Sequence, residues 1–235
     1  MTELERVLEV QVLDSAIDQI PHRRERLPER ATLAAAKATL RTTQQRIADA
    51  TARSEVASAR IEVLEAAGAK RATKKARLEQ QLKTVIAPRE AEALMGEIAN
   101  LDRERSESDD EELESMDGLE TAMAELEAAE AEAVTQQAAV DAASAEAAAA
   151  EAALEAERAD LVERRTAAAA AIAPATLTKY EQLRASYGGV AISRIHAGRC
   201  GACHLDQSRA GLDALNSAPD DALIECEQCG RLLVR

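Results

Sequence analysis

The sequence predicts a mostly α fold: a long antiparallel coiled-coil helical hairpin followed by a small C-terminal β zinc ribbon. Composition, the distribution of helix breakers and four cysteines near the C-terminus predict it. The 235 residues are 46% hydrophobic and 31% charged, yet they include 54 alanines, two tyrosines and no Phe or Trp. Aromatic side chains supply much of the area that a core buries, so we expect no large enzyme core. Abundant Ala, Glu, Arg and Leu with few breakers is typical of coiled coils.

Proline and glycine divide the helical part of the chain. A first helix is expected from about Thr2 to Arg26, because Leu27-Pro28 ends it. The residue before a proline is pushed out of the α region, so residues 84–88, which end in Pro88, are expected to form the hairpin turn. Pro174 ends the second long helix by the same argument.

These breaks predict two domains. Residues 1–175 are expected to form the hairpin, and residues 176–235 a four-cysteine zinc-ribbon domain. Six of the nine glycines lie at or after Gly188. The C-terminal segment therefore has the turns that a small β domain needs.

Apolar residues recur every seven positions on both long helices, as in a coiled-coil seam. One series runs from Leu33 to Ile61 and the other from Leu119 to Ala168. Many members are alanine, which permits close helix approach but buries little area. The apolar series is interrupted between Gly68 and Lys75.

Charge supports pairing of the two long helices. Residues 1–90 carry 17 Lys and Arg against 13 Asp and Glu, residues 91–175 carry 5 against 23, and residues 176–235 carry 7 of each. A mildly basic arm beside a strongly acidic one favours an antiparallel hairpin, in which position i faces roughly position 174 minus i. The net charge of -14 argues against a protein that coats nucleic acid and leaves room only for a local basic patch.

The C-terminal segment contains two C-x2-C pairs separated by 22 residues, Cys200 with Cys203 and Cys226 with Cys229. A two-residue spacer lets both thiolates of one turn reach a metal ion at ~2.3 Å, so we expect one structural Zn²⁺ held by all four. Structural zinc supplies apparent binding energy of ~10–16 kcal/mol, which becomes folding energy. We therefore expect the tail to unfold without metal while the hairpin stays helical.

Other uses of these cysteines are less consistent with the sequence. Residues 200–204 also spell C-x-x-C-H, the attachment sequence of c-type haem, but haem attachment would imply export and leaves the second pair unexplained. Thioredoxin-like chemistry needs a βαβ context that is missing here. His204 is an alternative zinc ligand, although a surface position beside the knuckle is favoured. Four thiolates close the coordination shell, which argues against catalytic zinc.

The hairpin, the run Ser108 to Glu114 (SDDEELE), and the segments Gly189 to Cys203 and Cys226 to Val234 resemble the bacterial coiled-coil proteins with a C-terminal four-cysteine zinc ribbon, most closely their actinobacterial branch. The resemblance implies a hairpin with a zinc ribbon at its base, no established enzymatic activity and roles as an adaptor or chaperone. Some relatives are linked to RNA binding through the ribbon, and to sigma-factor or secretion pathways. The four cysteines carry over residue by residue. Residues 205–212 depart from the proline-rich segment usual in the family, which leaves the partner open.

Two basic groups are candidate contacts for RNA or another partner. One lies near the hairpin turn and faces Glu97, Asp102 and Glu104, so intramolecular pairing is favoured over an anionic partner. It comprises Lys70, Arg71, Lys74, Lys75, Arg77 and Lys83. The other surrounds the cysteines and would gather on one face if residues 190–195 and 231–234 pair as strands. It comprises Arg194, His196, Arg199, Arg231 and Arg235.

We interpret the sequence as a non-enzymatic zinc-binding adaptor or chaperone-like protein that contacts another protein. The alternative is an RNA-binding regulator that acts through the ribbon. The sequence contains no plausible carboxylate pair, nucleophile–base set or phosphate loop, so no small-molecule substrate is expected. The sequence lacks an apolar run near the ~20 residues that cross a bilayer, and it lacks a secretory signal. We therefore expect a cytoplasmic location without membrane contact.

Overall fold

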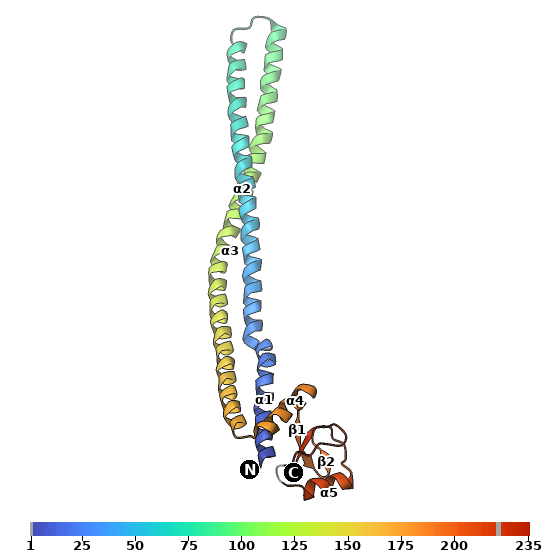
Figure 1. The fold of residues 1–235 in the computed structure, drawn as a ribbon. Helices are drawn as coiled ribbons and strands as arrows, with labels where there is room; N and C mark the ends of the chain where they lie inside the picture. Colours follow the sequence, from blue (N-terminus) through green and yellow to red (C-terminus); the bar gives the residue numbers. More distant parts are fainter. Residues whose placement is uncertain (1, 220–221) are drawn as a thin grey trace. The chain divides into compact units, whose positions relative to one another are not determined.

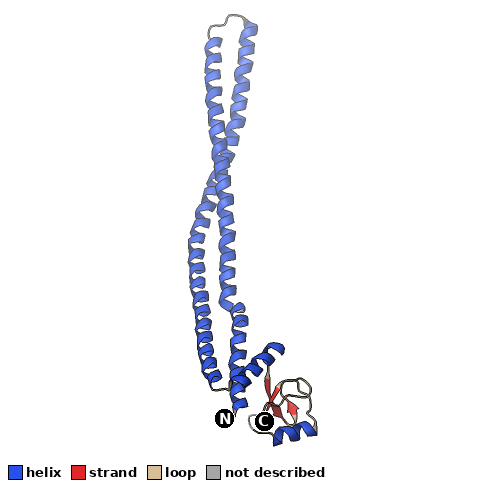
Figure 2. Ribbon diagram, viewed as in Figure 1, coloured by secondary structure: helices blue, strands red, loops and turns tan. Residues whose placement is uncertain are grey.

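The computed structural model describes residues 2–219 and 222–235, and it consists mainly of helices (Figure 1). Long helices form a hairpin, and the strands of the described residues all lie in the C-terminal segment (Figure 2). The predicted mostly α fold is therefore confirmed. The chain divides into two compact units, residues 1–31 with 145–235, and residues 32–144. The predicted domain boundary between residues 175 and 176 stays a prediction.

The first helix, α1 (Glu3–Glu25), has the bounds that the sequence predicts. Thr2 caps its N-terminus: the Thr2 hydroxyl accepts the Glu5 N–H at 3.2 Å, and the Glu5 carboxylate accepts the Thr2 N–H at 2.9 Å. This reciprocal capping box satisfies two backbone donors that a helix start leaves unpaired. The helix ends at Arg26, before Pro28 begins the next one.

Two long helices form the hairpin, α2 (Pro28–Leu82) and α3 (Pro88–Ala170). The turn between them falls at the predicted position. Within residues 32–144 they run antiparallel and are joined by the ion pairs Arg46–Glu132, Arg53–Glu125, Arg60–Glu111 and Lys74–Glu97. Each partner lies within about four residues of the position that the facing rule predicts. Of the helices in the described residues, none is both long enough and apolar enough to cross a membrane.

The seven-residue seam extends further along α2 than the apolar series indicates. Leu64 and Leu78 are buried, and Gly68, Arg71 and Lys75 between them are half-buried at the same spacing. Between Gly68 and Lys75 the residues of the seam are therefore no longer apolar, but the seven-residue spacing continues. A continuous helix keeps its period whatever the side chains are, and the long stems of Arg and Lys cover apolar surface while their charges reach water.

A shorter helix, α4 (Pro174–Ser186), follows α3 and was not expected. Pro174 does mark the end of α3, but it also occupies the first turn of α4, where its missing N–H costs no hydrogen bond. The helix ends at Tyr187, whose N–H donates to the Leu183 carbonyl at 2.9 Å.

The C-terminal segment forms a three-stranded sheet with strand order β2-β1-β3. Strand β1 (Ile192–His196) pairs antiparallel with β2 (Arg199–Cys200) and parallel with β3 (Leu232–Val234). The predicted pairing of residues 190–195 with 231–234 is thus present. Helix α5 (Arg209–Ser217) and strand β2 were not expected.

The sheet shares a hydrophobic core with α1. Val7 and Val10 of α1 are fully buried against Tyr180, Ile192 and Leu232. The strands therefore do not depend on the cysteines alone for burial, because one side of β1 and β3 is covered within this unit.

Candidate metal centre

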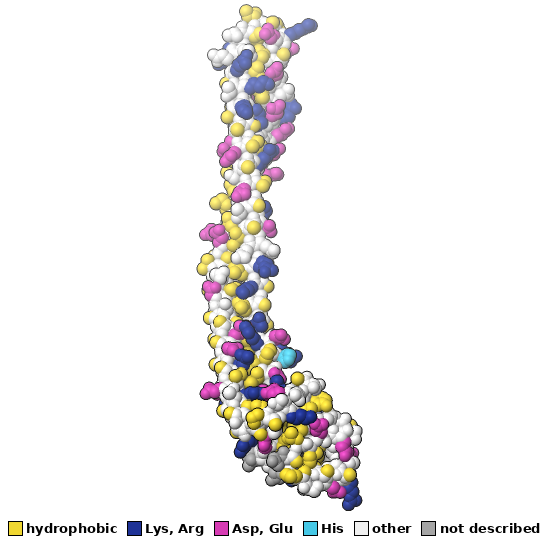
Figure 3. All heavy atoms as spheres, in the orientation of Figure 1, with side chains coloured by type: hydrophobic (Ala, Val, Ile, Leu, Met, Phe, Trp, Pro, Cys, Tyr) yellow, Lys and Arg dark blue, Asp and Glu magenta, His cyan; other side chains and the backbone are white. Residues whose placement is uncertain are grey.

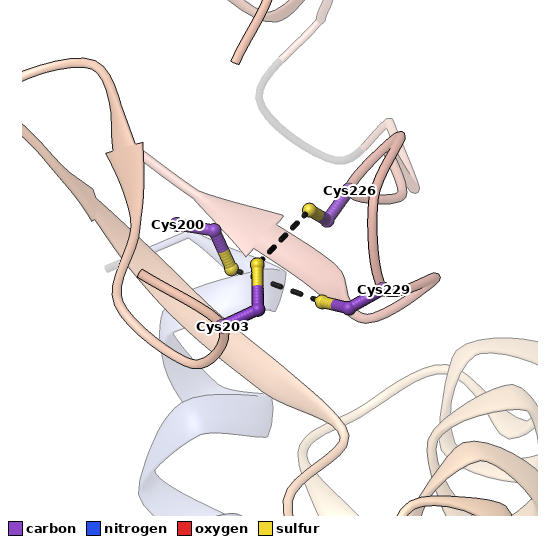
Figure 4. Close-up of side chains that lie close together, drawn as sticks. All are labelled: Cys200, Cys203, Cys226 and Cys229. Atoms are coloured by element: carbon purple, nitrogen blue, oxygen red, sulfur yellow. Dashed lines mark hydrogen bonds between the residues drawn. The ribbon is translucent and has the colours of Figure 1, made fainter. Parts of the chain in front are cut away.

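Four cysteine side chains point toward one another (Figure 4). The Sγ atoms of Cys200 and Cys229 are 4.0 Å apart, those of Cys203 and Cys226 are 3.9 Å apart, and all four lie within 4.8 Å of one another. A regular tetrahedron with Zn–S bonds of ~2.3 Å has S···S edges of about 3.8 Å. A disulfide joins its sulfurs at about 2.0 Å. The spacing therefore fits a tetrahedral metal ion and excludes disulfides in this conformation.

The two cysteine pairs lie on turns with the same backbone hydrogen bonds. The Cys200 carbonyl accepts the His204 N–H at 2.8 Å, and the Cys226 carbonyl accepts the Gly230 N–H at 2.9 Å. Both donor residues have positive φ, +62° at His204 and +71° at Gly230. Each turn thus directs two sulfurs to the same side.

Each cysteine turn contains a glycine at which a Cβ would collide with a neighbouring group, and the group differs between the two turns. A Cβ on Gly201 would lie 2.8 Å from the Ser193 hydroxyl and 2.9 Å from the Arg194 carbonyl, closer than nonbonded atoms approach. A Cβ on Gly230 would collide with the Tyr187 hydroxyl. Both turns therefore pack tightly on the elements that precede them.

Apolar and polar groups enclose the sulfurs. Cys200 and Cys226 are buried with Leu215 of α5 and Leu233 of β3. Gln207 donates a hydrogen bond to the Cys226 Sγ at 3.3 Å. Such donors orient a thiolate ligand and stabilise its negative charge.

The pKa values of two thiols reflect these surroundings. Burial disfavours the Cys226 thiolate, but hydrogen bonds from the backbone of Gln228 and Cys229 and from the Gln207 side chain outweigh it and lower the pKa to about 7. A backbone hydrogen bond from Leu205 favours the Cys203 thiolate. Burial and the three neighbouring thiols nevertheless raise its pKa to about 11. A divalent cation would offset this crowding of negative charge.

Among the described residues, the group of side chains placed to hold a metal consists of the four cysteines, with no histidine. His204 is exposed and serves as the left-handed residue that closes the first turn. The first C-x-x-C-H therefore matches the second C-x-x-C-G in backbone conformation.

The basic residues of the tail are largely engaged by the protein itself. Arg231 donates to the Val190 carbonyl at 2.8 Å, and its guanidinium lies 4.9 Å from the centroid of the Tyr187 ring. Arg235 donates to the Leu215 carbonyl at 2.8 Å. These contacts tie the end of the chain to α5 and to the segment before β1.

The remaining predicted contacts of the tail are Arg194, His196 and Arg199. Arg194 donates to the Arg235 carbonyl at 3.1 Å, and Arg199 pairs with Asp206 at 2.8 Å. His196 is exposed at the end of β1. Strand pairing therefore brings Arg194 and Arg235 together, but the Arg194 side chain donates to the Arg235 backbone carbonyl.

The basic stretch near the hairpin turn pairs in part with the facing helix. Lys74 lies 4.0 Å from Glu97, and Lys75 forms an ion pair with Asp102. Arg71 is half-buried in the seam, and Lys70 is exposed. Figure 3 shows Lys and Arg side chains interleaved with Asp and Glu at this end of the hairpin. The stretch is therefore a mixed surface.

Two buried polar residues of α1 position the sheet and were missed by sequence reasoning. The Gln11 side chain accepts the N–H groups of Ala191 at 2.6 Å and Ile192 at 2.8 Å, and it donates to the Ile192 carbonyl at 2.8 Å. Asp14 accepts the Tyr180 hydroxyl at 2.7 Å and pairs with Arg165 at 3.1 Å. No local signal marks either residue, because most of their partners lie more than 150 positions away.

The hairpin and the clustered cysteines define a helical-hairpin protein with a C-terminal four-cysteine centre. The chain belongs to the CT398-like coiled coil hairpin domain family, which matches residues 10–188. That match ends before the first cysteine, and it indicates no catalytic family.

Solved structures show the same fold. A protein from Mycobacterium smegmatis is 24% identical, with a TM-score of 0.83 over 100% of both chains. CT398 from Chlamydia trachomatis is 21% identical, with a TM-score of 0.77 over 98% of this chain and 96% of that one. HP0958 from Helicobacter pylori is 16% identical, with a TM-score of 0.57 over the same shares.

Sequence relatives are found in Mycobacterium tuberculosis. Uncharacterised proteins of two strains are 38% identical over 56 residues, which cover 24% of this chain and 22% of each relative. The aligned segment thus spans about a fifth of the curated relatives' length. These relatives agree with the actinobacterial resemblance and assign no activity.

Proposed function

We propose that this chain is a non-enzymatic adaptor: its four cysteines hold one structural Zn²⁺, and its hairpin contacts a protein partner. The observation that carries the proposal is the closed cluster of four sulfurs, all within 4.8 Å of one another. Four thiolates fill the tetrahedral shell of zinc and leave no position for a substrate or a reactive water.

The surface of the hairpin supports a protein partner. Val56, Leu113 and Val134 are apolar side chains with 59–74% of their surface exposed. A coiled coil of this kind needs no apolar side chain outside its seam for folding. Exposed apolar residues mark a protein contact where they form a contiguous patch, as Leu113 does with Met116 and Met123.

The nucleic-acid alternative has less support. Arg231 and Arg235 donate to backbone carbonyls, and Arg199 is paired with Asp206, so these side chains are committed to internal contacts. Phosphate binding depends on cations that are available to neutralise backbone charge. The acidic arm of the hairpin would also repel a polyanion.

A site-specific photo-cross-linker tests the adaptor role in cells of the native host. The cross-linking residue is placed at Val56, Leu113 or Val134 of the full chain, and His22 of α1 serves as the control position. We expect discrete covalent adducts with the same protein from at least one hairpin position and none from the control. Absence of protein adducts from every hairpin position would overturn the adaptor role, and adducts with RNA would favour the alternative.

A further inference from the structure

A groove of about 980 Å³ runs along the hairpin between α2 and α3, within residues 61–130. Its floor includes Ile61 of α2 with Leu119 and Leu126 of α3, which are half-buried residues of the seam. Met116 and Met123 line it with 50% and 57% of their surface exposed. The floor of the groove is therefore apolar.

The two methionines occupy an unusual place in a coiled coil. They are seven residues apart, each directly after a seam residue, at a position that commonly carries charge. On α2 the groove is lined by Ile61 and by Glu65, which occupies the corresponding heptad position. Methionine is flexible and polarisable, and it adapts to varied apolar partners.

Every charged residue that lines the rim of the groove is acidic. Six carboxylates line it and no Lys or Arg does: Glu65, Glu112, Asp117, Glu120, Glu127 and Glu130. In the part of the chain that the structure describes, none of these six forms an ion pair. The field over the groove is therefore strongly negative.

The other flank of the seam is different. There Arg46, Arg53 and Arg60 of α2 pair with Glu132, Glu125 and Glu111 of α3. The arginines of this part of α2 are thus held on the flank opposite the methionines. These three ion pairs have no counterpart among the residues that line the groove.

We propose that the groove binds an amphipathic helix of a partner protein, with an apolar face against Met116 and Met123 and with Lys and Arg residues against the acidic rim. This inference rests on the proposed adaptor role and names the chemistry of the partner. The α3 residues that line the groove run from Glu112 to Glu130, about 27 Å of helix axis at 1.5 Å per residue. A partner helix of about 18 residues matches that length, with anchors at i, i+3, i+4 and i+7.

Charge selects this occupant over others. Nucleic acid and anionic membranes carry the same sign as the rim and are repelled by it. A second copy of the chain would present the same acidic groove. A basic helix combines apolar contact with neutralisation of the six carboxylates.

The test uses the zinc-loaded full chain and an 18-residue helical peptide with leucines on one face and lysines on the other. Two control peptides are a Leu/Glu helix of equal length and a scrambled Leu/Lys sequence without helical periodicity. We expect saturable one-to-one binding of the Leu/Lys helix by titration calorimetry, weakened by salt. Equal binding of either control peptide would overturn the proposal.

Variants locate the peptide on the chain. We expect the Met116→Glu, Met123→Glu double variant to lose about tenfold or more in affinity, because it places charge on the apolar surface. Met95→Glu is the matched control: Met95 is also on α3 with 57% exposure but outside the groove, and its change should leave affinity within about twofold. Circular dichroism checks that both variants stay helical.

Full affinity in the double variant, or self-association through the groove in sedimentation experiments, would contradict the inference. The cross-linking experiment separates this failure from failure of the adaptor role. Adducts from Val134 without peptide binding in the groove would leave the adaptor role standing and remove the groove assignment. Peptide binding without any cellular adduct would leave the groove assignment standing and remove the adaptor role.

Discussion

His204 and Gly230 occupy the same place in the two cysteine turns. Each has positive φ, and each donates its N–H to the carbonyl of the cysteine four residues earlier. Glycine adopts this conformation without strain, whereas an L-residue with a Cβ does not. In the sequence His204 suggests haem attachment or zinc ligation. In the structure it closes the first cysteine turn in a left-handed backbone conformation that is strained for a residue with a Cβ.

Replacing this histidine is expected to stabilise the protein. His204→Gly should raise the free energy of unfolding by about 1 kcal/mol, because the left-handed conformation costs about 1–2 kcal/mol for an L-residue. Gly230→Ala, the matched change in the second turn, should destabilise, since its Cβ would collide with Tyr187. Thermal unfolding of both zinc-loaded variants measures the effect. A destabilised His204→Gly variant that also loses zinc would show that His204 is a ligand.

The sequence alone predicts that the tail unfolds without zinc, but the core that the strands share with α1 narrows this prediction: zinc removal is expected to loosen the cysteine turns while the hairpin stays helical. After chelation, hydrogen exchange should accelerate at the amides of His204 and Gly230, which depend on the turn geometry. The amides of Ala191 and Ile192 should stay protected longer, because Gln11 and the core shared with α1 hold them. Far-UV circular dichroism should fall only slightly. Exchange at the two turns that is unchanged after complete metal removal would contradict a structural metal.

The buried carboxylate of Asp14 is expected to be a major stabilising group of the unit that carries the sheet. Asp14→Asn should cost about 2 kcal/mol of unfolding free energy, because it weakens the buried hydrogen bond from the Tyr180 hydroxyl and removes the carboxylate that lies between Arg165 and Arg184. The control is Asp18→Asn, which removes an exposed partner of Arg184 and should cost under about 1 kcal/mol. Denaturant unfolding of both variants decides the point, and equal costs would refute the special place of Asp14.

Gly68 occupies a position of the seam, but we expect that glycine there weakens α2. A Cβ at this position would meet nothing within 4 Å, and the residue lies in a helix interior. Gly68→Ala should therefore raise the unfolding free energy by about 1 kcal/mol, since glycine has the greater backbone entropy when unfolded. An increase in the thermal midpoint checks this. A decrease would indicate that the glycine permits a close contact of the hairpin.

Much of the fold follows from local features of the sequence. Thr2 and Pro28 bound α1, and Pro88 locates the hairpin turn, because capping and proline geometry act over a few residues. The clustering of the four cysteines is also predicted by local spacing, since a C-x-x-C turn directs both sulfurs to one side.

Other features depend on distant contacts. Gln11 and Asp14 look like ordinary polar residues of a helix, and their roles arise from strands and helices that follow much later in the chain. The contacts of Arg231 and Arg235 also depend on distant residues. The sequence predicts that the strands pair, but it does not predict which carbonyls accept the hydrogen bonds of these two arginines. Helix α5 carries one local signal, the Ser208 cap that accepts the Gly211 N–H at 2.9 Å.

X-ray absorption at the zinc edge of the purified protein tests the four-sulfur metal centre most directly. We expect one zinc ion per chain with four sulfur neighbours at ~2.3 Å and no nitrogen or oxygen neighbour. That result would agree with a closed structural site. A shell with three sulfurs and a nitrogen or oxygen, or protein that binds no zinc when refolded with it, would contradict a four-sulfur centre.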